Sequence, residues 1–234
     1  MLEEILRGGF AELSLPLDAR AEERFRLYAD LLEEKNRVMN LTAIEGEDEV
    51  ARLHFLDSAA LLGFAGLGGK RVIDVGTGAG FPGLALKIAR DDISLVLLDS
   101  LDKRIGFLRE CCRALRLEDV ECVHARAEEI PAGFRESFDA AVSRAVARLN
   151  VLCELCLPYV RPGGLFIAMK GPDHAEELNE ARRAIKLLGA ELEGERDYRI
   201  PGTDVTHSAI LIRKTGATAP KYPRRWAQIK KQPL

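Results

Sequence analysis

The sequence predicts an α/β protein in which helices cover both faces of a mostly parallel β-sheet. From residue 71 onward, short apolar runs alternate with helical stretches. These runs are apolar at successive positions, as expected for strands that are buried on both faces of a parallel sheet. Helical periodicity before residue 66 predicts a helical extension, and two strand-like runs near the end predict an antiparallel hairpin.

The helical extension is expected over residues 1–66. An apolar stripe at helical spacing passes through a charged background around Leu27 and Leu31. The pattern stops at 36–42, and a second helical segment is expected over 48–64. Glycines then mark the boundary with the sheet domain.

The sheet domain is expected over residues 67–215, followed by a C-terminal segment over 216–234. The two final strands are separated by a turn signal, Pro201-Gly-Thr-Asp204. Seven strands are predicted, at 71–75, 94–98, 120–124, 138–143, 164–169, 191–200 and 206–213. The helices between them are predicted at 82–90, 103–117, 149–160 and 173–189.

The charges are unevenly distributed along the chain. The formal net charge is −3, from 34 basic and 37 acidic residues. No acid follows Asp204, whereas the last 22 positions hold seven basic residues, which leaves 27 basic and 37 acidic residues in 1–212. The segment from Gly216 has the composition of a mobile tail. A basic tail on an acidic body suits contact with a polyanion or a solvated, solubilising end.

The composition excludes several classes of protein. With 47% hydrophobic and 30% charged residues, the chain can bury a core. No apolar run approaches the roughly 20 residues of a membrane span, and the first residues lack a signal peptide's basic start. Five irregularly spaced cysteines predict no disulfide framework and no metal site, since Cys153 and Cys156 fall on the apolar face of a helix. We expect a cytoplasmic protein.

The strongest functional signal is a glycine-rich segment at the first strand-to-helix junction, Val72-Ile-Asp-Val-Gly-Thr-Gly-Ala-Gly-Phe-Pro-Gly83. Glycines let the backbone approach a ligand, and the next helix offers free N–H groups. The segment matches the dinucleotide pattern G-x-G-x-x-G, so a nicotinamide-dependent oxidoreductase is one interpretation. However, Asp74 ends the strand, and a carboxylate there suits a cationic ligand such as S-adenosylmethionine better than a pyrophosphate.

Two further acids follow the next strands. Asp99 ends the second strand, where its carboxylate could accept hydrogen bonds from ribose hydroxyls. Ala127 and Glu128 follow the third strand, where they could meet an adenine edge. The ordered set of acids favours S-adenosylmethionine over NAD, with Gly76 and Gly78 as further cofactor contacts in the loop.

The exit of the fourth strand, Ser143-Arg144-Ala145, should face the reacting methyl group. It carries neither the [DN]-P-P-[YF] pattern suited to exocyclic amines nor a cysteine for covalent attack on a pyrimidine. Arg144 could bind the methionine carboxylate or an RNA phosphate, because its planar guanidinium matches both. Arg148 and Lys170 lie on the same rim and are candidate phosphate contacts.

Several segments together resemble the RsmG (GidB) family. They follow one another along the chain as Asn36-x-x-x-Asn40-Leu-Thr42, His54-x-x-Asp57-Ser58, Asp74 to Gly83, Leu98-Asp-Ser-Leu-x-Lys-Arg104 and Ser143-Arg-Ala145. The ending also resembles that of the family in Lys221-Tyr-Pro-Arg224 and Pro233-Leu234. Between these two pieces, Trp226-Ala-Gln replaces an expected Gly-Thr-Pro.

This resemblance implies a Rossmann-like class I S-adenosylmethionine-dependent methyltransferase fold with a seven-stranded sheet. It also implies methylation of N7 of one guanine in 16S ribosomal RNA near the decoding region. The implied cofactor contacts are Gly76, Phe81, Ala127, Glu128 and Arg144. A methyltransferase of the same fold acting on a small molecule or protein, and an RNA-binding module without catalysis, remain alternatives.

The expected partner is 16S ribosomal RNA or the small ribosomal subunit, bound by a monomer. Guanine N7 carries a lone pair and no proton, so positioning should dominate catalysis and no catalytic base is nominated. His54 and Asp57 share a helix face, in a structural or an RNA-binding role. Tyr222 and Trp226 either stack on single-stranded RNA or pack on the domain. The candidate RNA contacts are Asn40, His54, Arg148, Lys170, Lys221, Arg224 and Arg225.

Overall fold

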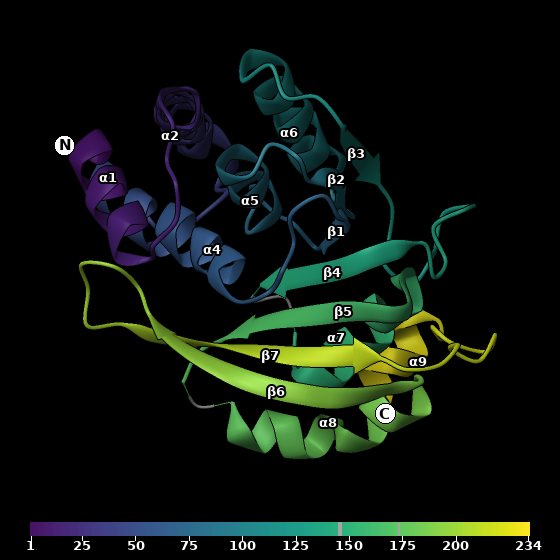
Figure 1. Ribbon diagram of the computed structural model, residues 1–234. Helices are drawn as coiled ribbons and strands as arrows, with labels where there is room; N and C mark the ends of the chain where they lie inside the picture. Colours follow the sequence, from purple (N-terminus) through teal and green to yellow (C-terminus); the bar gives the residue numbers. More distant parts are fainter. Residues whose placement is uncertain (145–146, 173) are drawn as a thin grey trace.

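The computed structural model describes residues 1–144, 147–172 and 174–234. It confirms the predicted fold class, with a seven-stranded sheet in the order β3-β2-β1-β4-β5-β7-β6 between two layers of helices (Figure 1). The first five strands are parallel, whereas β7 runs antiparallel to both β5 and β6. The strands are β1 (Arg71–Val75), β2 (Ser94–Asp99), β3 (Val120–His124), β4 (Phe138–Arg144), β5 (Val160–Lys170), β6 (Ala190–Arg199) and β7 (Thr206–Lys214).

The helices of the N-terminal extension pack on one face of the sheet beside α5 and α6 (Figure 1). Buried side chains of the extension and of this sheet face form one hydrophobic core, in which Phe25 and Val72 are fully buried. Because strand side chains alternate, Ile73 points to the opposite core, which α7, α8 and α9 cover. Among the described helices, none combines the length and the apolar character needed to cross a bilayer.

The helices fall into two groups along the chain. Those of the extension are α1 (Leu2–Glu12), α2 (Ala19–Met39), α3 (Glu47–Val50), a π-helical turn (Ala51–Leu56), α4 (Asp57–Ala59) and a 3-10 turn (Ala60–Gly63). Those of the sheet domain and C-terminal segment are α5 (Gly83–Ala89), α6 (Asp102–Ala114), α7 (Leu149–Cys156), a 3-10 turn (Leu157–Tyr159), α8 (Ala175–Leu187) and α9 (Trp226–Lys231).

The expected second helical segment is present but irregular. It starts at Glu47 and contains the π-helical turn Ala51–Leu56. The hydroxyl of Ser58 in α4 donates to the carbonyl of His54 in this turn at 2.6 Å. π-helical turns are rare in proteins, and many of those that occur lie at functional sites.

The boundary between α7 and β5 differs from its prediction. The helix expected over 149–160 ends at Cys156, and β5 begins at Val160 rather than at 164. Val160 pairs with Phe138 of β4, so sheet pairing extends the strand through a segment whose sequence reads as helix and turn. The helix expected from 173 begins at Ala175, and Asp173 lies outside the described residues. Cys153 and Cys156 are fully buried in α7, as predicted.

The C-terminal segment 216–234 packs on the domain, although its composition is typical of a mobile tail. Tyr222 is 7% exposed and Ile229 is fully buried. Arg135 donates to the carbonyls of Thr218 and Tyr222, each at 2.9 Å. Sequence composition missed this packing because only a few widely spaced apolar residues carry it.

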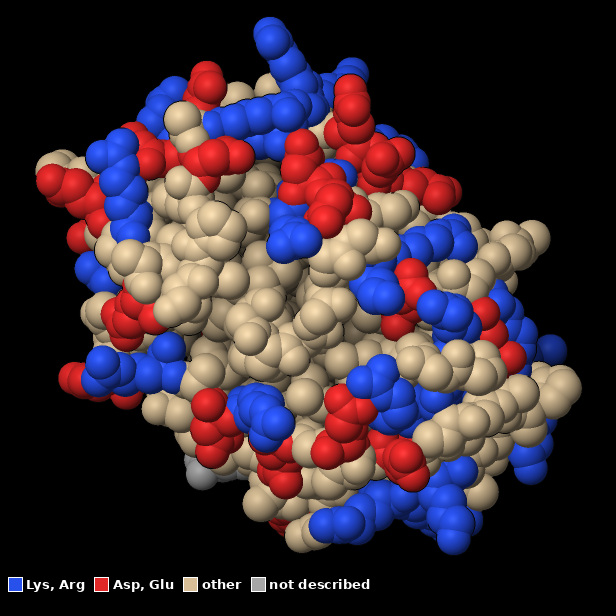
Figure 2. Space-filling view, viewed as in Figure 1, with Lys and Arg blue, Asp and Glu red and all other residues tan. Residues whose placement is uncertain are grey.

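The basic residues near the C-terminus are partly neutralised in space. Within the part of the chain that the structure describes, three of the seven form ion pairs with acids from the body of the protein: Arg213–Glu193, Lys214–Glu136 and Arg224–Glu154. On the face shown in Figure 2, cations and acids are interspersed around an uncharged centre. The separation of charge along the sequence is therefore weaker in the folded protein.

Candidate functional site

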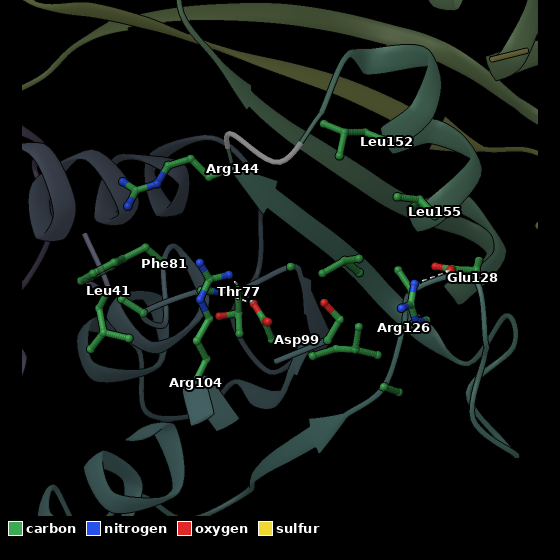
Figure 3. A pocket seen from close by; sticks show the side chains of 18 of the residues that line it. Leu41, Thr77, Phe81, Asp99, Arg104, Arg126, Glu128, Arg144, Leu152 and Leu155 are labelled. Atoms are coloured by element: carbon green, nitrogen blue, oxygen red, sulfur yellow. Dashed lines mark hydrogen bonds and ion pairs between the residues drawn. The ribbon is translucent and has the colours of Figure 1, made fainter. Parts of the chain in front are cut away.

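A cleft of about 580 Å³ opens at the carboxyl ends of β1, β2, β3 and β4 (Figure 3). In the sheet, the strand order reverses between β1 and β4, where ligands of open α/β sheets bind. The loops that follow β1, β2 and β3 form one wall. The N-terminal extension forms the opposite wall, and α7 and Trp226 complete the rim.

The glycine-rich loop after β1 takes backbone conformations that favour glycine. Gly76, Gly78 and Gly80 have φ angles of 73°, 61° and 107°. The N–H groups of Gly76 and Thr77 donate to the Leu98 carbonyl at 2.8 and 3.1 Å, which ties the loop to the end of β2. The loop is thus held against the neighbouring strand.

Tyr28 of α2 braces the same loop from the N-terminal extension. Its hydroxyl, which is fully buried with the ring, donates to the Ala79 carbonyl at 2.5 Å. A Cβ atom at Gly80 would lie 2.5 Å from that hydroxyl. The extension therefore fixes the shape of the loop, a role of Tyr28 that its place in a helical apolar stripe does not indicate.

Asp74 lies beneath the loop and is fully buried. Its Oδ2 accepts hydrogen bonds from the Thr77 hydroxyl at 2.7 Å and from the Gly83 N–H at 2.8 Å. Its Oδ1 has no partner among the described residues, and burial raises the pKa of the carboxyl to about 6. Asp74 does not line the cleft itself, so the geometry gives it a role in holding the loop.

Asp99, at the end of β2, lines the middle of the cleft and is 3% exposed. Its two oxygens accept from the backbone N–H groups of Gly78 at 3.0 Å and Leu101 at 2.9 Å, and Arg104 lies 3.4 Å away. An ionised carboxylate has about four acceptor sites, so it retains capacity for ribose hydroxyls. Its role as a ribose contact stays a prediction.

Ala127 and Glu128 line the far end of the cleft, beyond β3. The Tyr159 hydroxyl donates to the Ala127 carbonyl at 2.8 Å and fixes the backbone there. The Glu128 side chain is 10% exposed and lies 3.8 Å from the Arg126 guanidinium. The segment is therefore a fixed edge on which an adenine could rest.

Phe81, His54 and Arg144 form a compact cluster at the other end. The His54 ring stacks on Phe81 with 4.2 Å between ring centroids, and the Arg144 guanidinium lies 5.1 Å from the Phe81 centroid. Arg144 donates to Nδ1 of His54 at 2.7 Å. Burial and the Arg144 charge lower the pKa of His54 to about 3, so the imidazole is neutral at physiological pH.

Asp57 is a fully buried carboxylate that holds Arg144 in place. Its Oδ2 accepts from Arg144 at 2.9 Å. Its Oδ1 accepts from the Tyr198 hydroxyl at 2.8 Å and from Nδ1 of His207 at 2.9 Å, both on the C-terminal hairpin. The hydrogen bond that His207 donates to Asp57 raises the pKa of His207. The His54–Asp57 pair of the sequence is therefore part of a buried network.

Two of the predicted phosphate contacts on the rim are already paired. Arg148 donates to Glu180 at 2.7 Å and remains half exposed. Lys170 is 10% exposed and contacts Glu177 and the Ala147 carbonyl, each at 2.7 Å. Asn40 is exposed at the C-terminus of α2 and does not line the cleft. The proposed contacts of these three residues with RNA stay predictions.

The candidate RNA contacts in the C-terminal segment differ in whether their side chains are already bound within the protein. Arg224 is bound to the buried Glu154 through its backbone N–H at 2.8 Å and its guanidinium at 2.6 Å. Lys221 and Arg225 are exposed. Trp226 is 38% exposed and lines the cleft, whereas Tyr222 packs on the domain.

Several cleft residues were not named as candidate contacts from the sequence. Five of them, Leu41, Thr42, Thr77, Ser100 and Arg104, belong to the segments that resemble the family. Leu152 and Leu155 come from α7, where their spacing indicates only a buried helix face. Trp226, which the sequence offered as a residue that stacks on RNA or packs on the domain, also lines the cleft. Ala145 of the Ser143-Arg-Ala motif lies outside the described residues.

The donor set fits S-adenosylmethionine. Asp99 retains acceptor capacity in the middle of the cleft, and the unpartnered Asp74 oxygen leaves negative charge behind the loop. Arg144 has N–H groups without an acceptor among the described residues, which suits a carboxylate. Fold and site together define the class of protein, a Rossmann-like S-adenosylmethionine-dependent methyltransferase.

Comparison with known proteins identifies the family. The model of the GidB family, described as rRNA small subunit methyltransferase G, matches residues 21–196, and the chain belongs to this family. A ribosomal RNA small subunit methyltransferase G of Alkaliphilus oremlandii is 48% identical over all of this chain and 99% of its own length. One from Clostridium botulinum is 43% identical over 98% of each chain. The family predicted from the sequence is confirmed.

Solved structures agree with the fold. TrmN from Thermus thermophilus matches with a TM-score of 0.54 and 22% identity over 76% of this chain, which spans 53% of TrmN. The M. jannaschii TYW2 in complex with AdoMet matches with a TM-score of 0.51 and 12% identity, over 62% of this chain and 69% of its own. At these identities the likeness supports the fold alone.

Proposed function

We propose that this protein methylates N7 of one guanine in 16S ribosomal RNA, near the decoding region in the 530 loop. The relatives' names support methylation of small-subunit ribosomal RNA. The choice of N7 follows the resemblance described above and the chemistry of the cleft.

The observation that carries the proposal is that the described residues at the end of the cleft near Arg144 include no available base. Nδ1 of His54 accepts from Arg144, and Nε2 lies 2.8 Å from the Thr42 hydroxyl. Asp57 is occupied by three partners. Most nucleophiles would need to lose a proton, whereas guanine N7 presents a lone pair without one.

The residues of the cleft therefore act by positioning. S-adenosylmethionine supplies an electrophilic methyl carbon when it is bound. Asp99 would hold the ribose, and the edge at Ala127 and Glu128 would hold the adenine. Arg144, fixed by Asp57 and His54, would hold the methionine carboxylate. Fixing both reactants in one orientation can supply several kcal/mol of barrier reduction, about 7–11 in favourable cases.

Trp226 and its basic neighbours support an RNA partner. The indole lines the cleft and is partly exposed, as expected for a platform on which an unpaired base stacks. Arg225 precedes it and is exposed, so a cation that can meet phosphate stands beside the ring. This arrangement favours RNA over a small molecule or a protein as the acceptor.

The test is transfer of labelled methyl from S-adenosylmethionine to 16S ribosomal RNA, offered naked and within the small subunit. We expect one labelled guanine, and cleavage chemistry specific for N7-methylguanine should map it. Asp99→Ala is the matched inactive control. Label on a different atom or in protein would reject the N7 assignment, and RNA binding without transfer would support a non-catalytic module.

The assembly state and compartment belong to the same proposal, a monomer acting in the cytoplasm. The large apolar side chains that are exposed in the described chain come from different elements, so no single element offers an apolar face to a second copy. They are Met1, Val38, Leu101, Leu187, Val205 and Trp226. Sedimentation equilibrium should give a mass near 25.9 kDa. A concentration-independent mass of twice that value would reject the monomer.

A further inference from the structure

The hydroxyl of Thr42 occupies a fixed position on the N-terminal wall of the cleft. Asn36 holds the Thr42 backbone on both sides, since its Nδ2 donates to the Thr42 carbonyl at 3.0 Å and its Oδ1 accepts from the Thr42 N–H at 2.9 Å. The Thr42 Oγ1 lies 2.8 Å from Nε2 of His54 and 3.0 Å from the Ile44 backbone nitrogen. Thr42 is half-buried and lines the cleft.

Arg144 determines which nitrogen of His54 carries the proton. A guanidinium only donates hydrogen bonds, so Nδ1 of His54, 2.7 Å away, must accept. A neutral imidazole then carries its proton on Nε2, which donates to Thr42. The low pKa of His54, about 3, keeps the ring neutral at physiological pH.

The Thr42 hydroxyl can therefore only donate a hydrogen bond to a ligand in the cleft, for the following reason. A hydroxyl oxygen accepts at most two hydrogen bonds through its lone pairs. The His54 N–H and the Ile44 N–H take both. The hydroxyl proton has no acceptor among the described residues, and a half-buried donor without an acceptor is costly. The cleft thus presents a hydrogen-bond donor that cannot become an acceptor.

Position separates this donor from the cofactor contacts. Asp99 ends β2, and Ala127 and Glu128 belong to the loop that follows β3, whereas Thr42 belongs to the N-terminal extension. Figure 3 shows its neighbour Leu41 with Phe81 at one end of the cleft and Glu128 at the other. Arg144 at the same end already offers N–H groups to a carboxylate.

We infer that the Thr42 hydroxyl donates to O6 of the acceptor guanine and so selects guanine against adenine, an inference that rests on the proposed function. On the base edge that carries N7, guanine presents the acceptor O6. Adenine presents an N6 amino donor at the same place, and two donors facing each other leave both unpaired. The buried His54–Arg144 pair locks Thr42 in the selective state.

The test compares the Thr42→Val variant, which lacks the hydroxyl, with RNA carrying 2-aminopurine, which lacks O6 but keeps N7. Each change alone should lower kcat/KM about 10-fold, the worth of one hydrogen bond. If the Thr42 hydroxyl and O6 contact each other, kcat/KM of Thr42→Val on the 2-aminopurine RNA should be no lower than kcat/KM after either change alone. Thr42→Ser keeps the hydroxyl and should retain most of the activity.

Independent losses that multiply to about 100-fold would overturn the inference. A comparable loss of adenosylhomocysteine affinity in Thr42→Val, measured by calorimetry, would assign the hydroxyl to the cofactor and would also overturn it. Thermal unfolding of each variant shows whether the fold is retained, and the Ser variant tests the hydroxyl if Val disturbs it. Failure of the unmodified protein to methylate guanine N7 would instead reject the proposed function, and this inference with it.

Discussion

The sheet wall and the N-terminal wall of the cleft differ in the sequence distance over which they are assembled. On the sheet wall, the Gly78 N–H donates to Asp99, 21 residues away. On the N-terminal wall, Asp57 receives Arg144 from 87 residues away and His207 from 150 residues away. The first wall is made mainly by backbone groups of adjacent loops, and the second by buried side chains from distant elements.

This difference has a consequence for stability and function. Changes on the sheet wall should disturb cofactor binding while the core stays intact, because the loops lie at strand ends. Changes in the buried networks should disturb the fold, because a buried charge that loses its partner keeps its desolvation cost.

The largest effect is expected from Asp57→Asn, which removes the charge that Arg144 and His207 share. Breaking such a buried pair should lower the free energy of unfolding by about 4 kcal/mol. Urea unfolding measures this, with the exposed Asp204→Asn as the control. A loss below about 1 kcal/mol would mean that the network contributes to the site but little to the fold.

The next effect concerns the C-terminal segment, where two adjacent arginines provide a matched pair. Arg224→Ala removes the cationic partner of the fully buried Glu154, and we expect a loss of about 3 kcal/mol in the free energy of unfolding. Arg225→Ala should change stability by less than about 0.5 kcal/mol, because Arg225 is exposed. Adding Glu154→Gln to Arg224→Ala should recover part of the loss in the same unfolding experiment. No recovery would contradict an electrostatic cause.

Asp74 should make stability depend on pH in the acidic range. Its folded pKa of about 6 exceeds the ordinary value of 3.8, so the folded state favours the protonated form. The resulting stability, up to about 3 kcal/mol for a shift of this size, is present below pH 3.8 and is lost as pH rises through 6. Subtracting the Asp74→Asn profile from that of the unmodified protein should reveal this slope, and Glu191→Gln should not remove it.

Gly76→Asp should weaken binding to the sheet wall. A side chain at a φ of 73° is strained by about 1–2 kcal/mol, and its carboxylate would add a second negative charge to the wall of the cleft that holds Asp99. Calorimetry should show about 100-fold weaker binding of adenosylhomocysteine, which is about 2.7 kcal/mol. Gly106→Ala, in an exposed position of α6, is the control and should bind normally. Normal binding by both variants would reject the loop as the cofactor site.

The smallest effect is expected from the exposed C-terminal cations. Lys221→Ala and Arg225→Ala should each reduce the slope of log affinity for RNA against log salt by about 0.7 to 0.9, without changing cofactor affinity. Point variants are preferable to truncation, because Tyr222 and Ile229 of the same segment belong to the core. An unchanged slope would show that these two residues of the C-terminal segment do not contact RNA phosphates.

Sequence patterns predicted much of the fold. Alternation of apolar runs and helical stretches predicted the five parallel strands, and two strand-like runs around a turn signal predicted the antiparallel hairpin. The main errors fell where tertiary contacts decide. Val160 joins β5 because Phe138 lies opposite, and the segment 216–234 is ordered because Arg135 and Glu154 bind its backbone and Arg224. Local composition carries no information about such partners.

For the cleft, the sequence by itself determined the sheet wall. Glycines with positive φ and acids at strand ends are local requirements, and they lie next to the strands that position them. Only the tertiary structure decided the other wall. Asp57, Arg144 and His207 become one network, and Thr42 becomes a fixed donor, because burial forces each polar group to find a partner regardless of its distance along the chain.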